Sequence, residues 1–252
     1  MLLAVDIGNT TIAFGIVKAG RVLKIKRIET HQSELILKRA IKGTALLLKK
    51  QYKGIAGIVI CSVVPPASAT VSSILKEVFK IKPLIVGQDI VVPIKNLYRN
   101  PNQVGKDRLV EAYAASFLYG TPLIIIDFGT AITYNIVSAK REYLGGIIVP
   151  GIRLSAESLF KKTALLPKVK IKTPKNIIGK TTNESILSGL FYGYGAMSVG
   201  LIDKISKTFK SRPQVVVTGG YTHWVKKYFA EKIDVVDEHL IFKGLALLWS
   251  SL

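Results

Sequence analysis

Apolar positions in this chain follow two spacings, and their order predicts an α/β architecture that occurs twice. Short apolar runs bounded by turn residues predict strands, while apolar residues three or four apart over longer segments predict helices. The predicted strands are residues 2–5, 11–17, 22–28, 55–64, 83–86, 123–126, 132–137, 143–148 and 214–217. The predicted helices are residues 33–51, 67–79, 108–119, a segment from 154, 182–209 and 240–252. Because the order of elements begins again at residue 123, we predict two related domains, residues 1–119 and 120–252.

The sequence itself repeats at the start of each half. One apolar strand runs into Asp6-Ile7-Gly8-Asn9-Thr10, another runs into Asp127-Phe128-Gly129-Thr130, and similar apolar strands follow both. Glycine lets backbone N–H groups approach a phosphate, and a threonine hydroxyl adds a donor. The aspartates would repel phosphate alone, so they imply cations at the site. Either turn alone could be an ordinary Asp–Gly turn. The matched pair instead predicts two phosphate-binding hairpins across a cleft, as in an ATP-using phosphotransferase.

Two shorter motifs have possible ligand chemistry, and each keeps a structural alternative. Thr218-Gly219-Gly220 follows a strand, where the glycines could let adenine or ribose lie on the backbone, but a plain turn explains them equally. Asp107-Arg108 opens a helix. The arginine could hold a carboxylate in a two-point fork and the aspartate could accept a proton from an attacking hydroxyl. The alternative is a helix-capping aspartate beside a solvated arginine.

The helix predicted from residue 182 carries two further signals. Thr181, Thr182, Asn183 and Glu184 form a capping box at its start. Three glycines, Gly189, Gly193 and Gly200, lie four and seven residues apart along it. Glycine costs about 1 kcal/mol per helical position, so the three predict close contact with another element. A partner subunit and the sheet of the same domain are equal candidates for that element.

Composition indicates a globular protein of the cytoplasm. Hydrophobic residues make up 49% of the 252 residues, which argues against disorder. No uninterrupted apolar stretch reaches the roughly 18 residues of a membrane span, and residues 1–5 lack the basic start of a signal peptide. The single cysteine, Cys61, cannot form an intramolecular disulfide and sits in a strand pattern, so we expect a buried core residue in a reducing compartment. We expect no membrane partner.

The formal net charge of +20 leaves two interpretations open. One is a nucleic-acid-binding protein, and the other is a solvated, lysine-rich surface. We favour the second, because the basic residues are spread along the chain apart from a cluster between Lys161 and Lys180, and aromatic residues do not alternate with them. The three histidines, His31, His223 and His239, are isolated from each other and from Cys61, so no metal site is expected from them.

These motifs recur with others in a family-specific order. The additional segments are Ser62-Val63-Val64-Pro65, Tyr98 with Asn100-Pro101, Val104-Gly105, Gly145-Gly146, Pro150-Gly151, Thr163-Ala164-Leu165-Leu166-Pro167 and Ile178-Gly179-Lys180. Over essentially its whole length the chain resembles the type III pantothenate kinases of the sugar kinase–Hsp70–actin superfamily. The resemblance implies duplicated actin/Hsp70-like (ribonuclease H-like) domains, each a mixed sheet flanked by helices, with a cleft between them. It also implies ATP-dependent phosphorylation of pantothenate, the first step of coenzyme A biosynthesis.

The resemblance assigns roles to residues as well. Asp107 would be the catalytic base and Arg108 would hold the pantothenate carboxylate, with Lys106 beside them. Tyr98, Gly105 and Thr182 would complete the pocket, with Thr182 coming from the partner subunit of a homodimer. The residues implied to bind ATP are Asp6, Ile7, Gly8, Asn9, Thr10, Thr11, Ile12, Ala13, Gly129, Thr130, Gly219 and Gly220. Asp6 would lie near Mg²⁺, and Asp127 would bind a monovalent cation, K⁺ or NH₄⁺. Thr11, Lys106 and Thr181 depart from the family's usual residues without removing a role.

Two other classes of function remain open. Members of this family have been linked to a transcription accessory role, which the high charge keeps conceivable. A second alternative is a superfamily kinase that acts on another small hydroxy acid or on a sugar. A sugar has no carboxylate, so a requirement for Arg108 would separate the two kinase alternatives.

Overall fold

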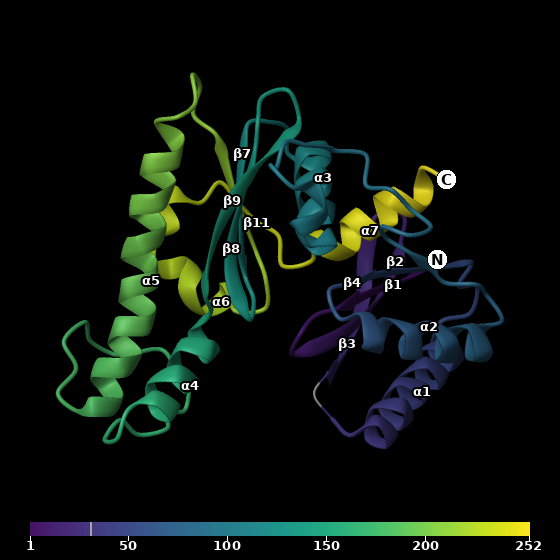
Figure 1. Cartoon of the computed structure of the whole chain (residues 1–252), viewed down its shortest axis with the longest axis horizontal. Coiled ribbons are helices and arrows are strands. Elements are labelled where there is room, and N and C mark those ends of the chain that lie inside the picture. The colour runs from purple at the N-terminus through teal and green to yellow at the C-terminus, as the bar shows by residue number, and fades with distance from the viewer. Residues whose placement is uncertain (31) are drawn as a thin grey trace. The chain divides into compact units, whose positions relative to one another are not determined.

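The computed structural model describes residues 1–30 and 32–252, and its internal contacts divide the chain into two units (Figure 1). The first unit contains Met1–Phe117 and His239–Leu252, and the second contains Leu118–Glu238. His31, one of the histidines considered as a metal ligand, lies outside the described residues. Residues 239–252, which the sequence analysis grouped with the second domain, thus fold with the first unit.

The first unit is a mixed sheet with helices on both faces. Its strands lie in the order β3-β2-β1-β4-β5. Strand β2 is antiparallel to its neighbours β1 and β3, and β4 and β5 are parallel to β1. The strands are β1 (Leu2–Ile7), β2 (Thr11–Lys18), β3 (Arg21–Glu29), β4 (Gly57–Ser62) and β5 (Leu84–Ile85). The helices are α1 (Glu34–Gln51), α2 (Pro65–Phe79), α3 (Lys106–Leu118) and α7 (Leu240–Ser250). Between α2 and α3 lie the short strand β6 (Lys95–Asn96) and a 3₁₀ turn, η1 (Pro101–Gln103).

Helix α7 completes the first unit by covering the sheet face opposite α1 and α2 (Figure 1). Its ring side chains occupy space that two strand glycines leave open. Phe242 lies over Gly15 of β2, and Trp249 lies over Gly57 of β4. The apolar stripe of α7 predicts that the helix packs on a sheet but does not identify which of the two sheets. Which sheet it covers depends on these contacts between residues distant in sequence.

The second unit repeats this plan. Strands β11-β10-β7-β8-β9 lie side by side. Strand β8 is antiparallel to its neighbours β7 and β9, and β10 and β11 are parallel to β7. The strands are β7 (Leu123–Phe128), β8 (Ala131–Val137), β9 (Glu142–Pro150), β10 (Gln214–Thr218) and β11 (Val235–Val236). The helices are α4 (Ile152–Lys162), α5 (Thr182–Ser206) and α6 (Thr222–Val225), with 3₁₀ turns η2 (Lys226–Tyr228) and η3 (Ala230–Lys232). The predicted duplication of a mixed α/β unit is therefore confirmed.

Helix α5 begins at the predicted capping box. The Thr181 Oγ1 accepts the N–H of Glu184 at 3.2 Å, and Glu184 Oε2 accepts the N–H of Lys180 at 2.8 Å. Although the sequence has no uninterrupted apolar stretch of membrane-spanning length, α5 is long and apolar enough to cross a membrane. It is nevertheless part of the core of the second unit, where Ile186, Leu190 and Phe191 are buried against the sheet. Core helices of globular proteins pass the same test.

Candidate active site

The first Asp–Gly hairpin is a closed turn held by a residue from the next strand. Gly8 donates its N–H to the Thr11 carbonyl at 2.9 Å. Thr30, buried at the end of β3, donates its hydroxyl to the Gly8 carbonyl at 2.8 Å and its N–H to the Thr10 carbonyl at 2.9 Å. Both contacts fix the turn through its carbonyl oxygens. Sequence reasoning missed Thr30, whose only signal is a hydroxyl directly after an edge strand.

Burial differs among the residues of this hairpin. Asn9 and Thr11 are exposed, whereas Ile7, Ile12 and Ala13 are buried strand residues whose side chains belong to the core. These three residues can therefore present only backbone groups to a ligand. Asp6 is half-buried and lies opposite Cys61 in the parallel pairing of β1 with β4.

Acidic side chains from two distant segments surround Cys61. Burial raises the pKa of the Cys61 thiol well above its ordinary value, and three carboxylates within electrostatic range raise it further. These carboxylates are those of Asp6, Asp107 and Glu111. The thiol is buried and stays protonated, as expected for a core cysteine. Asp6 of the first hairpin and Asp107 of α3 therefore both influence the Cys61 thiol electrostatically.

Asp107 lies in the first turn of α3, which begins at Lys106. Its Oδ1 accepts the N–H of Arg108 at 2.8 Å. Burial raises the pKa of Asp107 above its ordinary value, and the N–H and charge of Arg108 oppose that shift without cancelling it. Gly105 lies so close to this carboxylate that an added Cβ would overlap Asp107 Oδ1. The carboxylate is thus held by its neighbours and has more affinity for a proton than a solvated aspartate has.

Arg108 is buried, at 8% exposure, which removes the alternative of a solvated arginine. One helical turn further along α3, Glu111 is buried at 6% exposure, and sequence reasoning did not single it out. Residues three apart on a helix are neighbours. Arg108 and Glu111 are therefore buried neighbours on α3.

The loop before α3 positions the remaining residues predicted to bind substrate. Lys106 is half-buried. A Cβ added at Gly87 would lie 2.8 Å from Lys106 Cε, so the aliphatic part of this lysine packs against Gly87. Tyr98 donates its N–H to Asn96 Oδ1 at 3.0 Å. Asn96 in turn donates its side-chain amide to the Pro101 carbonyl at 3.2 Å. Asn96 thereby ties both ends of this loop together.

In the second unit the second hairpin meets the Thr218-Gly219-Gly220 turn. Gly129 donates its N–H to the Ala131 carbonyl at 3.2 Å, which closes the hairpin. Tyr221 donates its N–H to the Phe128 carbonyl at 3.0 Å. Gly219 adopts φ +98°, and an added Cβ would overlap Asp127 Oδ1 and lie 2.6 Å from the Phe128 nitrogen. Only glycine fits there. The Asp127 carboxylate is therefore in direct contact with the Gly219 backbone.

A third turn supports the second hairpin from β9. Gly151, the residue before α4, donates its N–H to the Thr130 carbonyl at 3.0 Å. An added Cβ at Gly151 would overlap Thr130 and lie 2.6 Å from the Gly129 carbonyl oxygen. The Pro150-Gly151 motif is thus packed onto the hairpin, while the Thr130 side chain is exposed.

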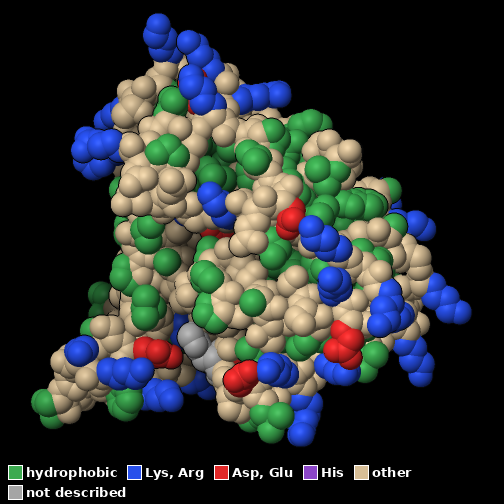
Figure 2. All heavy atoms as spheres, turned by 45° about the vertical axis from the view of Figure 1, so that its right-hand side comes forward, with side chains coloured by type: hydrophobic (Ala, Val, Ile, Leu, Met, Phe, Trp, Pro, Cys, Tyr) green, Lys and Arg blue, Asp and Glu red, His purple; other side chains and the backbone are tan. Residues whose placement is uncertain are grey.

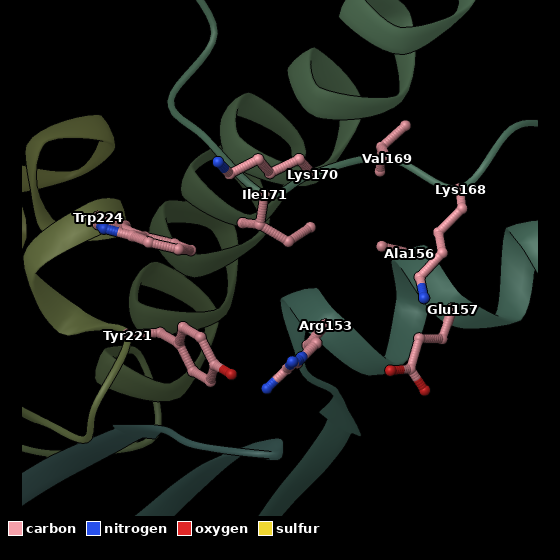
Figure 3. A pocket seen from close by; sticks show the side chains of 9 residues that line it. All are labelled: Arg153, Ala156, Glu157, Lys168, Val169, Lys170, Ile171, Tyr221 and Trp224. Atoms are coloured by element: carbon pink, nitrogen blue, oxygen red, sulfur yellow. The ribbon is translucent and has the colours of Figure 1, made fainter.

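A cavity of about 570 Å³ opens beside these turns in the second unit (Figure 3). The aromatic rings of Tyr221 and Trp224 line one side of it, and Arg153 extends into it from α4. The other lining residues are Ala156, Glu157, Lys168, Val169, Lys170 and Ile171. Aromatic faces with several cations suit a flat, anionic ligand. The sequence signals were the aromatic residues after Gly219-Gly220 and the basic cluster, and neither was assigned to a pocket.

Thr182 belongs to a different unit from the other residues that the resemblance assigns to pantothenate. It is exposed at the first position of α5 in the second unit, whereas Asp107 and Arg108 belong to the first unit. Directly before it, Gly179 packs against the backbone of Glu184 and Ser185, which fixes the approach to the helix.

The acidic residues of the hairpins fit cations that share their ligands with a nucleotide. Within residues 1–30 and 32–252, no three His, Cys, Asp or Glu side chains are arranged to hold a metal ion by themselves. Mg²⁺ is commonly bound by one or two carboxylates together with phosphate oxygens. Asp6 supplies such a carboxylate beside the first hairpin. Asp127, between the Gly129 and Gly219 backbones, offers the oxygen donors that hard cations prefer.

Known proteins of similar fold share the architecture at low sequence identity. The chain is similar to a putative Baf family transcriptional activator from Campylobacter jejuni, with a TM-score of 0.59, 19% identity and coverage of 99% and 98% of the two chains. It is also similar to the activator of a 2-hydroxyisocaproyl-CoA dehydratase from Clostridium difficile, solved with bound ADPNP, with a TM-score of 0.56, 13% identity and coverage of 99% and 94%. The predicted fold of duplicated actin/Hsp70-like domains is confirmed.

Sequence comparison gives a closer relationship. Residues 2–207 match the family model described as type III pantothenate kinase. A type III pantothenate kinase from Bacillus cytotoxicus is 38% identical over 258 aligned residues, which cover 99% of this chain and 95% of that protein. On these matches, the chain belongs to the type III pantothenate kinase family.

Proposed function

We propose that the chain transfers the γ-phosphoryl group of ATP to the primary hydroxyl of pantothenate, the first step of coenzyme A biosynthesis. The observation that carries this proposal is the pair on α3, a carboxyl whose pKa burial raises next to a buried guanidinium. Family membership supports the same reaction. A proton acceptor beside a carboxylate-binding group matches a substrate that carries both a hydroxyl and a carboxylate.

In the proposed reaction Asp107 accepts the hydroxyl proton while the substrate oxygen forms a bond to the γ-phosphorus. The bond from that phosphorus to the bridging oxygen of ATP breaks, and ADP leaves with the electron pair. Arg108 holds the pantothenate carboxylate, so the hydroxyl is presented to Asp107 in a fixed orientation. Tyr98, Gly105 and Lys106 shape the pocket around it, and Thr182 of the partner subunit closes it.

The nucleotide is proposed to bind along the turns of both units. In the first unit the turn from Asp6 to Thr11 presents backbone and hydroxyl donors to phosphate, and Mg²⁺ beside Asp6 would neutralise phosphate charge. In the second unit Gly129 and Thr130 contact phosphate, and K⁺ or NH₄⁺ would be held at Asp127. Gly219 and Gly220 lie next to the cavity of Tyr221 and Trp224, which suits the stacked base of ATP.

The homodimer is part of the proposal, and three glycines of α5 support it. An added Cβ at Gly189, Gly193 or Gly200 would meet no atom within 4 Å. By contrast, a Cβ at Gly195 would lie 2.5 Å from Tyr228 Cβ. Of the two explanations offered for the glycine spacing, packing within the unit therefore applies to Gly195 and not to the other three. The open face suits a helix from a second subunit.

We propose a cytoplasmic location, since ATP and a reduced Cys61 are both found there. We also propose that the charge of +20 serves solubility and attraction of anionic substrates. In the view of Figure 2, Lys and Arg side chains are scattered among hydrophobic and neutral groups.

The experiment is ADP release by the purified protein with ATP, Mg²⁺ and pantothenate, in potassium and then in sodium buffer. We expect turnover that depends on pantothenate and collapses in sodium. Equal rates in both salts would argue against a monovalent site at Asp127. No turnover with pantothenate would contradict the proposed reaction, and a screen of other hydroxy acids, together with a salt-dependent DNA-binding assay, would then test the two alternatives.

The effect of replacing Arg108 distinguishes pantothenate from a neutral sugar as the substrate. Arg108→Ala should raise the KM for pantothenate sharply, because a charge-assisted contact to its carboxylate is lost. The KM for a neutral hydroxylated substrate should not change. An unchanged pantothenate KM would remove Arg108 from the proposed pocket.

A further inference from the structure

Tyr194 of α5 reaches the junction between β9 and α4 through its hydroxyl. The Tyr194 Oη lies 2.7 Å from the Pro150 carbonyl oxygen and 2.7 Å from Ser155 Oγ. Pro150 is the last residue of β9, and Ser155 lies in the first turns of α4. The Tyr194 side chain therefore hydrogen-bonds both to β9, which ends just before Gly151, and to α4, which begins just after it.

The protons in this network can be assigned from the chemistry of the groups. A carbonyl can only accept, so the single Tyr194 hydroxyl proton goes to Pro150 and Ser155 donates to Tyr194. One turn further along α5, Ser198 donates its hydroxyl to the Tyr194 carbonyl at 2.7 Å. The hydroxyl of Tyr134, from β8, must then donate to Ser198 Oγ at 2.9 Å. The chain of bonds thus runs from the sheet through α5 to the start of α4.

The end of this chain adjoins two parts of the nucleotide site. Gly151 donates its N–H to the Thr130 carbonyl at 3.0 Å, and there is no space for a Cβ between them. A displacement of the β9–α4 junction must therefore move the second phosphate hairpin. The same first turn of α4 carries Arg153, which lines the cavity beside Tyr221 (Figure 3).

We propose that Tyr194 is a positioning residue for nucleotide binding, which fixes the Thr130 hairpin and the Arg153 side of the cavity through Pro150 and Ser155. This proposal rests on the proposed function in assigning ATP to the second unit. It adds that α5, whose open glycine face suits a second subunit, is connected by hydrogen bonds to the phosphate hairpin. A purely structural tyrosine would contribute stability alone.

The first test is Tyr194→Phe, which removes the hydroxyl and keeps the ring. A lost hydrogen bond of this kind corresponds to a change between about two- and tenfold. We expect the KM for ATP to rise by that factor while the KM for pantothenate stays unchanged. The matched control is Tyr192→Phe, two residues earlier on α5, whose ring packs edge-on against Tyr228 at 4.7 Å between centroids. It should leave both KM values unchanged.

A binding measurement separates this proposal from the reaction itself. The chain has two tryptophans, Trp224 in the cavity and Trp249 against Gly57 in the first unit. The substitution Trp249→Phe therefore leaves Trp224 as the single fluorescent reporter. Titration with ADP should give a weaker Kd in Tyr194→Phe than in its parent. Ser155→Ala should weaken ADP in the same direction, and the double variant should lose less than the sum of the two changes, because they share one bond.

The outcomes distinguish the two hypotheses. Weaker ADP binding in both variants without any pantothenate turnover by the parent protein would retain the positioning role and reject pantothenate as substrate. An unchanged Kd for ADP and an unchanged KM for ATP, with only a lower Tm, would overturn the proposal and leave Tyr194 as a structural residue. The same shift in the KM for both substrates would also overturn it.

Discussion

Among single residues, Asp107 has the environment that a proton acceptor requires. A solvated aspartate is a weak base near neutral pH, since its conjugate acid has a pKa of about 3.9. Burial raises the pKa of Asp107, and the adjacent Arg108 keeps the ionised form accessible by opposing that shift. From sequence alone, a helix cap beside a solvated cation remains an alternative for the same two residues. The burial of Arg108 argues against the solvated cation, and we propose Asp107 as the proton acceptor.

Asp107→Asn should therefore abolish most of the activity. We expect kcat to fall more than about 100-fold, the range lost with a general base. The kcat/KM of the wild-type protein should rise with pH through the raised pKa of Asp107, because only the ionised carboxylate accepts a proton. This acidic limb should be missing from the variant's pH profile. Near-normal kcat, or the same acidic limb in the variant, would remove Asp107 as the base.

The same carboxyl should also lower the stability of the fold at neutral pH. Because its folded pKa is raised, the unfolded chain loses this proton at a lower pH than the folded chain does. Stability therefore falls as pH rises through the window between the ordinary and the raised pKa of Asp107. Asp107→Asn should have a higher Tm than wild type above that window and no advantage below it. Calorimetry from about pH 4 to about pH 7 would measure this, and a Tm difference independent of pH would contradict it.

Among the elements, the two hairpins were predictable and their supports were not. Each hairpin has a local signal, an apolar strand followed by Asp-x-Gly, and the repeat made the fold class clear. Thr30 and Tyr194 act through contacts between residues distant in sequence, as the Thr30–Gly8 bond across 22 residues and the Tyr194–Pro150 bond across 44 residues illustrate. Spacing within one element carries no information about such contacts. The Thr218-Gly219-Gly220 turn was ambiguous for the same reason, because its neighbour Asp127 is distant in sequence.

The two glycines of this turn should respond differently to alanine. At Gly219, alanine would adopt an unfavourable positive φ and overlap Asp127, so we expect a loss of several degrees in Tm, about 1 kcal/mol or more of stability. At Gly220, an added Cβ would meet no atom within 4 Å, so Gly220→Ala should retain the wild-type Tm. Thermal unfolding of both variants tests the placement of the turn against Asp127. Equal Tm losses would show that the turn does not approach Asp127 in this way.

For the whole molecule, the proposed role of Thr182 depends on a partner subunit. Within one chain Thr182 begins α5 in the second unit, and the residues proposed to bind pantothenate are in the first. The resemblance implies a partner subunit, and we propose that the open glycines of α5 form the surface that contacts it. Sequence spacing identified the glycines but left two explanations. The empty space beside Gly189, Gly193 and Gly200, in contrast to the contact of Gly195 with Tyr228, argues against packing within the unit and supports the proposed dimer.

Gly193→Leu tests this surface, because its expected effects on the subunit and on the dimer are opposite. Leucine is a better helix former than glycine by up to about 1 kcal/mol, and an added Cβ at Gly193 would meet no atom of the described residues within 4 Å. The Tm of an isolated subunit should therefore not fall, while a close contact between helices would be blocked. Gly43→Leu on α1, also without neighbours within 4 Å, is the matched control. Light scattering should report a monomer for Gly193→Leu and a dimer for Gly43→Leu. If both variants remain dimeric with unchanged pantothenate KM, the partner must bind elsewhere, and Thr182 loses its route into the site.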